Sequence, residues 1–70
     1  MMKRVLITTS RDDVRRILDQ IPYQASYFTG DTRTTTYHYS VRTGPHQFQD
    51  LARVTWNDAK KHYTVRLLAD

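Results

Sequence analysis

Only one stretch of this sequence has a helical period, which limits the chain to a single helix. Apolar side chains recur at i, i+3, i+4 and i+7 in Val14, Ile17, Leu18 and Ile21. This spacing places them on one side of a helix. Pro22 follows directly, and a proline disfavours the α region for the residue before it. The pattern predicts a helix from Arg11 to about Ile21 and leaves the rest of the chain to strands and turns.

The start of this helix is marked by its flanking residues. Ser10 is suited to an N-cap, and Asp12 and Asp13 place negative charge at the positive end of the helix dipole. Before it, residues 3–9 are short and β-branched, with apolar side chains in succession. Such a run is typical of a strand covered on both faces. We therefore expect the first strand to lie inside the sheet.

Alternation of apolar and polar side chains predicts strands in the remainder of the chain. The expected strands are residues 23–29, 32–43, 47–56 and 62–69, with turns at Gly30-Asp31, Gly44-Pro45 and Asn57–Lys60. The alternation changes phase near Asp50, which indicates a β-bulge. The direction of the first strand relative to its neighbours stays open.

These elements predict one α+β domain over residues 1–70, in the order β-α-β-β-β-β. One N-terminal amphipathic helix packs on one face of a mostly antiparallel four- to five-stranded sheet. A chain of 70 residues buries only about 60% of the surface that its unfolded form exposes. It has no cysteine, and its scattered histidines form no recognisable metal-ligand set. We expect no cofactor and no metal, and no segment resembles a family that we recognise.

The alternation also assigns side chains to the two faces of the sheet. Those expected beneath the helix are Tyr37, Tyr39, Val41, Val54, Trp56, Tyr63, Val65 and Leu67. Those expected on the opposite face, called the open face below, are His38, Ser40, Arg42, Arg53, Thr55, His62, Thr64 and Arg66. The phases of Tyr23, Tyr27 and Phe28 are not defined by the pattern. The open face is thus basic and rich in hydroxyl groups.

The candidate binding residues lie on this open face: Arg42, Arg53, Arg66, His38, His62 and Thr64. The chain has a formal net charge of +4, which attracts anionic partners. Arginine suits bidentate contact with phosphate or carboxylate groups. The same residues also fit a solvated sheet face that only keeps a small protein in solution. Because the expected aromatic positions lie on the other face, stacking of nucleic-acid bases on the open face is disfavoured.

The first functional hypothesis is a small non-enzymatic binding module. Its open face would engage a negatively charged partner, either a nucleic-acid backbone or an acidic protein surface. An alternative is an inhibitor from a phage or mobile element, of the anti-CRISPR type, that sterically blocks a host protein. A third is a small metal-independent ribonuclease toxin, in which His38 and His62 act as acid and base beside Arg42 or Arg66.

The sequence also indicates where the protein is located and whether it can assemble. No apolar run approaches the roughly 20 residues of a membrane span, so we expect a cytoplasmic protein with no membrane partner. An exposed edge of the sheet offers a route to a homodimer.

Overall fold

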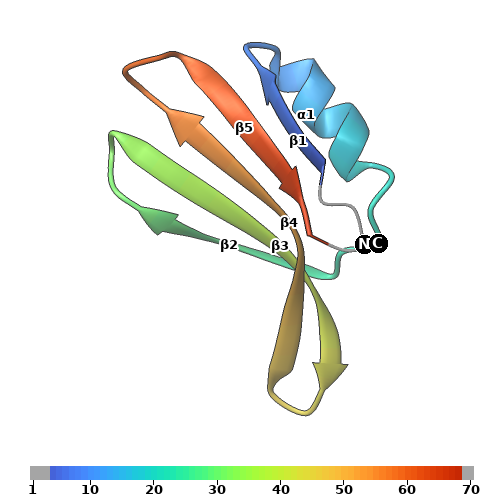
Figure 1. The fold of residues 1–70 in the computed structure, drawn as a ribbon. Helices are drawn as coiled ribbons and strands as arrows, with labels where there is room; N and C mark the ends of the chain where they lie inside the picture. Colours follow the sequence, from blue (N-terminus) through green and yellow to red (C-terminus); the bar gives the residue numbers. More distant parts are fainter. Residues whose placement is uncertain (1–3, 69–70) are drawn as a thin grey trace.

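The protein folds into one five-stranded antiparallel sheet and one helix, as Figure 1 shows. The structure is a computed structural model that describes residues 4–68. The elements are β1 (Arg4–Thr8), α1 (Arg11–Leu18), β2 (Ala25–Gly30), β3 (Thr34–Gly44), β4 (Gln47–Asn57) and β5 (His62–Leu67). The order of strands across the sheet is β1-β5-β4-β3-β2. The predicted α+β class is confirmed, and the strand count is five.

Three hairpins connect β2, β3, β4 and β5 in sequence. Their turns lie at the predicted positions, which are rich in glycine, asparagine and aspartate. The Asp31 carboxylate accepts hydrogen bonds from the backbone N–H groups of Arg33 at 2.9 Å and Thr34 at 3.0 Å. These bonds lower the pKa of Asp31. Gly30 has a φ of 103°, which a residue with a side chain rarely adopts. The Asn57 side chain accepts from the N–H of Lys60 at 3.0 Å.

β1 lies at the edge of the sheet, so the expectation that it lies inside the sheet is wrong. It pairs antiparallel with β5, with Leu6 opposite Val65. Val5 and Ile7 are 57% and 61% exposed. The reason is topological: consecutive hairpins order β2 to β5 side by side, so β1 joins the free edge of β5 and has no neighbour on its other side.

The helix begins as predicted and ends earlier. The Ser10 hydroxyl accepts from the backbone N–H of Asp13 at 3.3 Å, which confirms the N-cap. After Leu18 the backbone hydrogen bonds join residues three apart instead of four. Gln20 N–H donates to Ile17 C=O and Ile21 N–H to Leu18 C=O, both at 3.1 Å. Such i to i+3 bonds tighten the end of a helix. The helical period therefore extends beyond the helix that forms.

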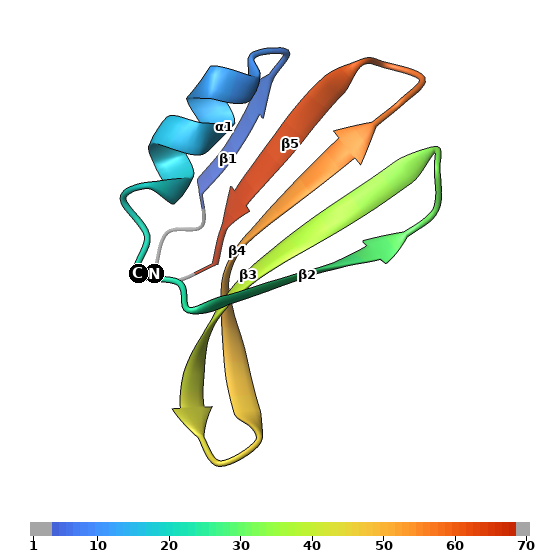
Figure 2. The same cartoon turned by 180° about the vertical axis from the view of Figure 1, so that it is seen from behind.

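The core lies between the helix and one side of the sheet. Val14 packs with Val54 and Val65, which are 2% and 1% exposed. Figure 1 and Figure 2 show α1 beside β1 and β5 and away from β2. The axis of α1 runs along β1 and not across the strands, as Figure 1 shows. The helix therefore covers the sheet only by its diameter of about 10–12 Å, whereas five strands span about 19 Å.

The predicted element order β-α-β-β-β-β is found, with the helix second, after β1. The prediction that this helix covers the apolar face is wrong for part of that face. The helix lies along β1 and β5 and leaves the β2 and β3 side of the face uncovered.

The predicted bulge occurs in β4. Pairing of β3 and β4 shifts between Tyr39 and Ser40, whose partners are Ala52 and Asp50, so Leu51 has no partner in the β3–β4 register. A bulge bends and twists a strand pair. Beyond it, the closed end of the β3–β4 hairpin projects away from the rest of the sheet (Figure 2). We call this segment, residues 41–49, the projecting arm.

Candidate functional site

The strand register brings basic side chains of the open face into one line across the sheet. Arg66 of β5 lies opposite Arg53 of β4, and Arg53 lies opposite His38 of β3. Val5 and Tyr27 extend the line to the two edge strands. We call these five residues the arginine row. Two of the three predicted arginines are therefore direct cross-strand neighbours.

A second line, of hydroxyl groups, runs parallel to the first. Cross-strand pairing aligns Ile7, Thr64, Thr55, Thr36 and Thr29, in that order from β1 to β2. The hydroxyls of Thr36 and Thr55 are 3.1 Å apart. We call this line the threonine row. It places the predicted Thr64 beside Arg66. Of the other three threonines, Thr36 and Thr55 bond each other, and Thr29 bonds the His38 ring.

An acidic residue that the sequence reasoning omitted, Asp50, organises the arginine row. Its Oδ2 accepts from His38 Nδ1 and from Arg53 Nε, each at 2.9 Å. Burial raises the pKa of Asp50, but hydrogen bonds from His38 and Arg53 outweigh burial and hold the pKa below its ordinary value. Because Asp50 occupies only Nε of Arg53, the terminal nitrogens of this guanidinium remain available for a ligand.

Tyr27, whose phase the sequence left open, lies on the open face opposite His38. Its ring stacks on the His38 imidazole, with centroids 4.5 Å apart and an interplanar angle of 1°. Tyr27 is 50% exposed, so part of its ring remains accessible. The phase of β2 could not be read from its sequence, because serine, threonine and aromatic residues alternate there without an apolar side.

Arg42 and His62 lie apart from the arginine row. Arg42 is in the projecting arm opposite Phe48, and its Nε donates to the Gly44 carbonyl at 3.2 Å. His62 pairs with Asn57, four positions along β5 from Arg66, which is about 13 Å at 3.3 Å per residue. The six predicted binding residues therefore do not form one cluster. Arg53, Arg66, His38 and Thr64 lie together, whereas Arg42 and His62 are at opposite ends of the open face.

The histidine pair of the ribonuclease hypothesis is not brought together. His38 lies on β3 and His62 on β5, with β4 between them, so two strand spacings of about 4.8 Å add to their offset along the strands. His38 instead bonds Asp50 through Nδ1, and its Nε2 lies 2.9 Å from Oγ1 of Thr29. A carboxylate only accepts hydrogen bonds, so Nδ1 carries a proton. These contacts fix the orientation of the ring.

Ser40, also on the open face, is 1% exposed and donates to the Ala25 carbonyl at 3.5 Å. Its hydroxyl is thus enclosed at the bulge and does not present itself to a ligand.

Across residues 4–68 no group of three or more histidine or acidic side chains is arranged to hold a metal ion. The same part of the chain contains no helix with the length and apolar character needed to cross a membrane. Comparison with protein-family models, with curated proteins and with solved structures finds no significant match to this chain.

Proposed function

We propose that the protein is a non-enzymatic binding module whose open face engages the phosphate backbone of a nucleic acid. The observation that carries this proposal is the direct cross-strand pairing of Arg53 with Arg66. Like charges directly opposite each other destabilise a sheet. An anionic partner that contacts both guanidiniums removes this repulsion and gains charge-assisted hydrogen bonds.

The surroundings of the pair support a phosphate ligand. Asp50 offsets one of the two positive charges and holds Arg53 by its Nε. Thr64 of the threonine row lies beside Arg66 and offers a neutral hydroxyl donor, a group that commonly contacts phosphate oxygens. At the end of the arginine row, the half-exposed ring of Tyr27 offers a surface for an unpaired base.

Binding of labelled single-stranded and duplex oligonucleotides, followed by fluorescence polarisation at several salt concentrations, tests the proposal. The variant Arg53→Gln/Arg66→Gln removes both guanidiniums of this cross-strand pair. The control Arg16→Gln/Lys61→Gln removes two positive charges elsewhere, from exposed ion pairs with Asp13 and Asp58. Both variants have the same net charge, so a difference between them reports the site and not the overall field.

We expect the open-face variant to bind at least about tenfold more weakly than the control. Its logarithmic salt dependence for a single strand is reduced by about 0.7 for each lost phosphate contact. Equal affinities of the two variants would contradict the proposal. Failure of the unmodified protein to bind any oligonucleotide would also contradict it, and would favour the acidic protein surface as partner.

A further inference from the structure

A groove lies on the opposite face of the sheet, between α1 and β3, because the helix lies along β1 and β5 and leaves the rest of that face uncovered. The groove has a volume of about 970 Å³, at the upper end of the roughly 300–1,000 Å³ typical of ligand pockets. One wall is formed by the helix and its C-cap, and the floor by Tyr23 and by side chains of the sheet. The lining residues are Arg11, Asp12, Val14, Arg15, Leu18, Asp19, Tyr23, Tyr37, Tyr39, Val54, Trp56 and Tyr63. It shares no residue with the open face.

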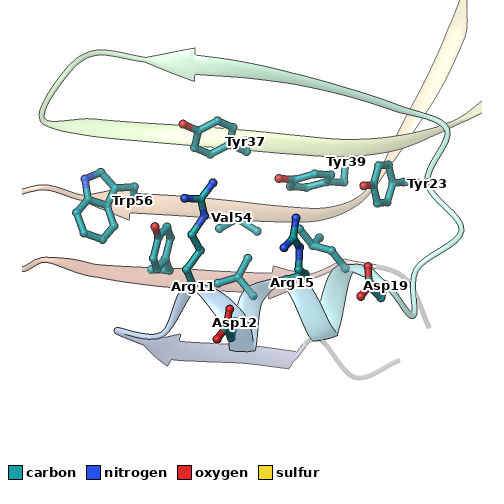
Figure 3. Close-up of a pocket in the computed structure, with 12 residues that line it drawn as sticks. Arg11, Asp12, Arg15, Asp19, Tyr23, Tyr37, Tyr39, Val54 and Trp56 are labelled. Atoms are coloured by element: carbon teal, nitrogen blue, oxygen red, sulfur yellow. The ribbon is translucent and has the colours of Figure 1, made fainter.

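The floor of this groove is aromatic. Trp56 and Tyr63 contact at one end, with centroids 4.6 Å apart, and Tyr23 and Tyr39 form an edge-to-face pair at 4.9 Å at the other. Tyr37, between them in Figure 3, is 39% exposed. Burial, with Tyr23 and Tyr37 nearby, raises the pKa of Tyr39, so its hydroxyl stays protonated. The floor offers flat rings and hydroxyl donors together.

The aromatic surface continues to the sheet edge. Phe28 of β2 lies opposite Tyr37, with ring centroids 6.2 Å apart. Phe28 is 71% exposed. Phe28 and Tyr37 thus form a contiguous exposed aromatic surface, and such surfaces often mark contact sites. An occupant of the groove that reaches Tyr37 can therefore extend onto Phe28.

Two arginines extend over this floor from the helix. Figure 3 shows the guanidiniums of Arg11 and Arg15 pointing toward Tyr37 and Tyr39, whereas the carboxylates of Asp12 and Asp19 stay beside the helix. Within residues 4–68 neither guanidinium takes part in an ion pair, unlike Arg16 of the same helix. The two arginines are four residues apart, which is one helical turn and about 6 Å along the axis.

We propose that this groove binds a segment of single-stranded nucleic acid, with successive phosphates at Arg11 and Arg15 and a base stacked on Tyr37. Aromatic floors beside basic side chains bind single strands because every base has a flat face and every linkage carries a charge. A duplex keeps its bases stacked on one another and does not present them to Tyr37. The inference is independent of the open face and adds a second site that selects unpaired strands.

Trp56, the single tryptophan of the chain, is a built-in reporter for the groove. Titration with unlabelled oligothymidylate, a duplex of the same length and thymidine monophosphate follows the quenching of its fluorescence. We expect saturable quenching by the single strand, at concentrations where the duplex and the free nucleotide give little. Quenching by the free nucleotide at the same concentrations would overturn the assignment to a strand.

Variants separate the groove from overall charge and from folding. Arg11→Gln/Arg15→Gln should weaken the binding at Trp56 at least about tenfold relative to the charge-matched Arg16→Gln/Lys61→Gln. Tyr37→Leu should weaken it by roughly 5- to 150-fold, corresponding to about 1–3 kcal/mol for a stacked base. Tyr37→Phe should retain binding because it keeps the ring. Urea unfolding of each variant verifies that the fold is intact.

The open-face variant Arg53→Gln/Arg66→Gln distinguishes this inference from the proposed function. If it weakens polarisation binding but keeps the quenching of Trp56, and the groove variant loses the quenching but keeps part of the polarisation binding, both sites exist. If it loses all binding while Arg11→Gln/Arg15→Gln behaves like the control, the groove inference is refuted and the open-face proposal stands. Loss of binding only in the groove variants refutes the open face instead.

Discussion

Replacement of Asp50 by alanine tests how the arginine row is held in place. One carboxylate oxygen, Oδ2, accepts from both His38 and Arg53 at 2.9 Å. The side chains of Asp50 and His38 are each 14% exposed, whereas that of Arg53 is 45% exposed. Asp50→Ala therefore leaves the His38 Nδ1–H largely shielded without a partner, while the Arg53 guanidinium can turn to water.

The expected loss follows from these exposures. A hydrogen bond to a charged group contributes about 1.5–3 kcal/mol, and a half-exposed ion pair adds at most about 1 kcal/mol. We expect Asp50→Ala to lower the free energy of unfolding at neutral pH by about 2 kcal/mol. In a domain of this size that corresponds to a fall in Tm of roughly 10 °C.

The pH dependence gives a second measurement on the same residue. Burial raises the pKa of Asp50, yet hydrogen bonds from His38 and Arg53 bring it below the ordinary value of 3.8. A carboxyl whose pKa is lowered by folding stabilises the protein above its unfolded pKa. That contribution is lost as the pH falls through the folded pKa, hence below about pH 4. Asp50→Asn should remove this part of the acid sensitivity.

Urea unfolding followed by Trp56 fluorescence, at neutral pH and at about pH 3, measures both effects. Asp31 and Asp58 also have lowered pKa values, from backbone bonds and from Lys61 respectively, so the informative quantity is the difference between Asp50→Asn and the unmodified protein. If Asp50→Ala unfolds at the same urea concentration as the unmodified protein, the reasoning fails. Parallel pH profiles of Asp50→Asn and the unmodified protein would likewise refute it.

Two further substitutions test the core and a turn. Val54→Ala should cost about 2 kcal/mol of unfolding free energy, measured by urea titration, because Val54 is 2% exposed and two buried methyl groups are lost at about 0.8 kcal/mol each with a cavity left behind; no change would show that the core collapses around the gap. Gly30→Ala should destabilise by more than about 1 kcal/mol, since φ is 103° and an added Cβ would meet the Thr34 carbonyl oxygen; a thermal melt equal to that of the unmodified protein would exclude strain at this turn.

The sequence by itself determined the helix and the strands, and the face of the sheet on which most of the strand side chains lie. Side-chain period separates helix from strand, so the cap at Ser10, the turns at Gly30 and Asn57 and the bulge beside Asp50 could all be predicted locally. In β3, β4 and β5 the alternation also assigned Arg53 and Arg66 correctly to the open face, because alternate residues of a strand point to opposite sides.

Only the tertiary structure decided which of these side chains meet. Cross-strand pairing depends on strand order and register, which no local pattern encodes, so the sequence grouped Arg42 with Arg53 although the bulge carries Arg42 into the projecting arm. For the same reason, the sequence did not predict the hydrogen bond between Asp50 and His38 or the stacking of Tyr27 on His38. The uncovered aromatic groove arises because the single helix lies along β1 and β5, and its diameter is too small to cover all five strands.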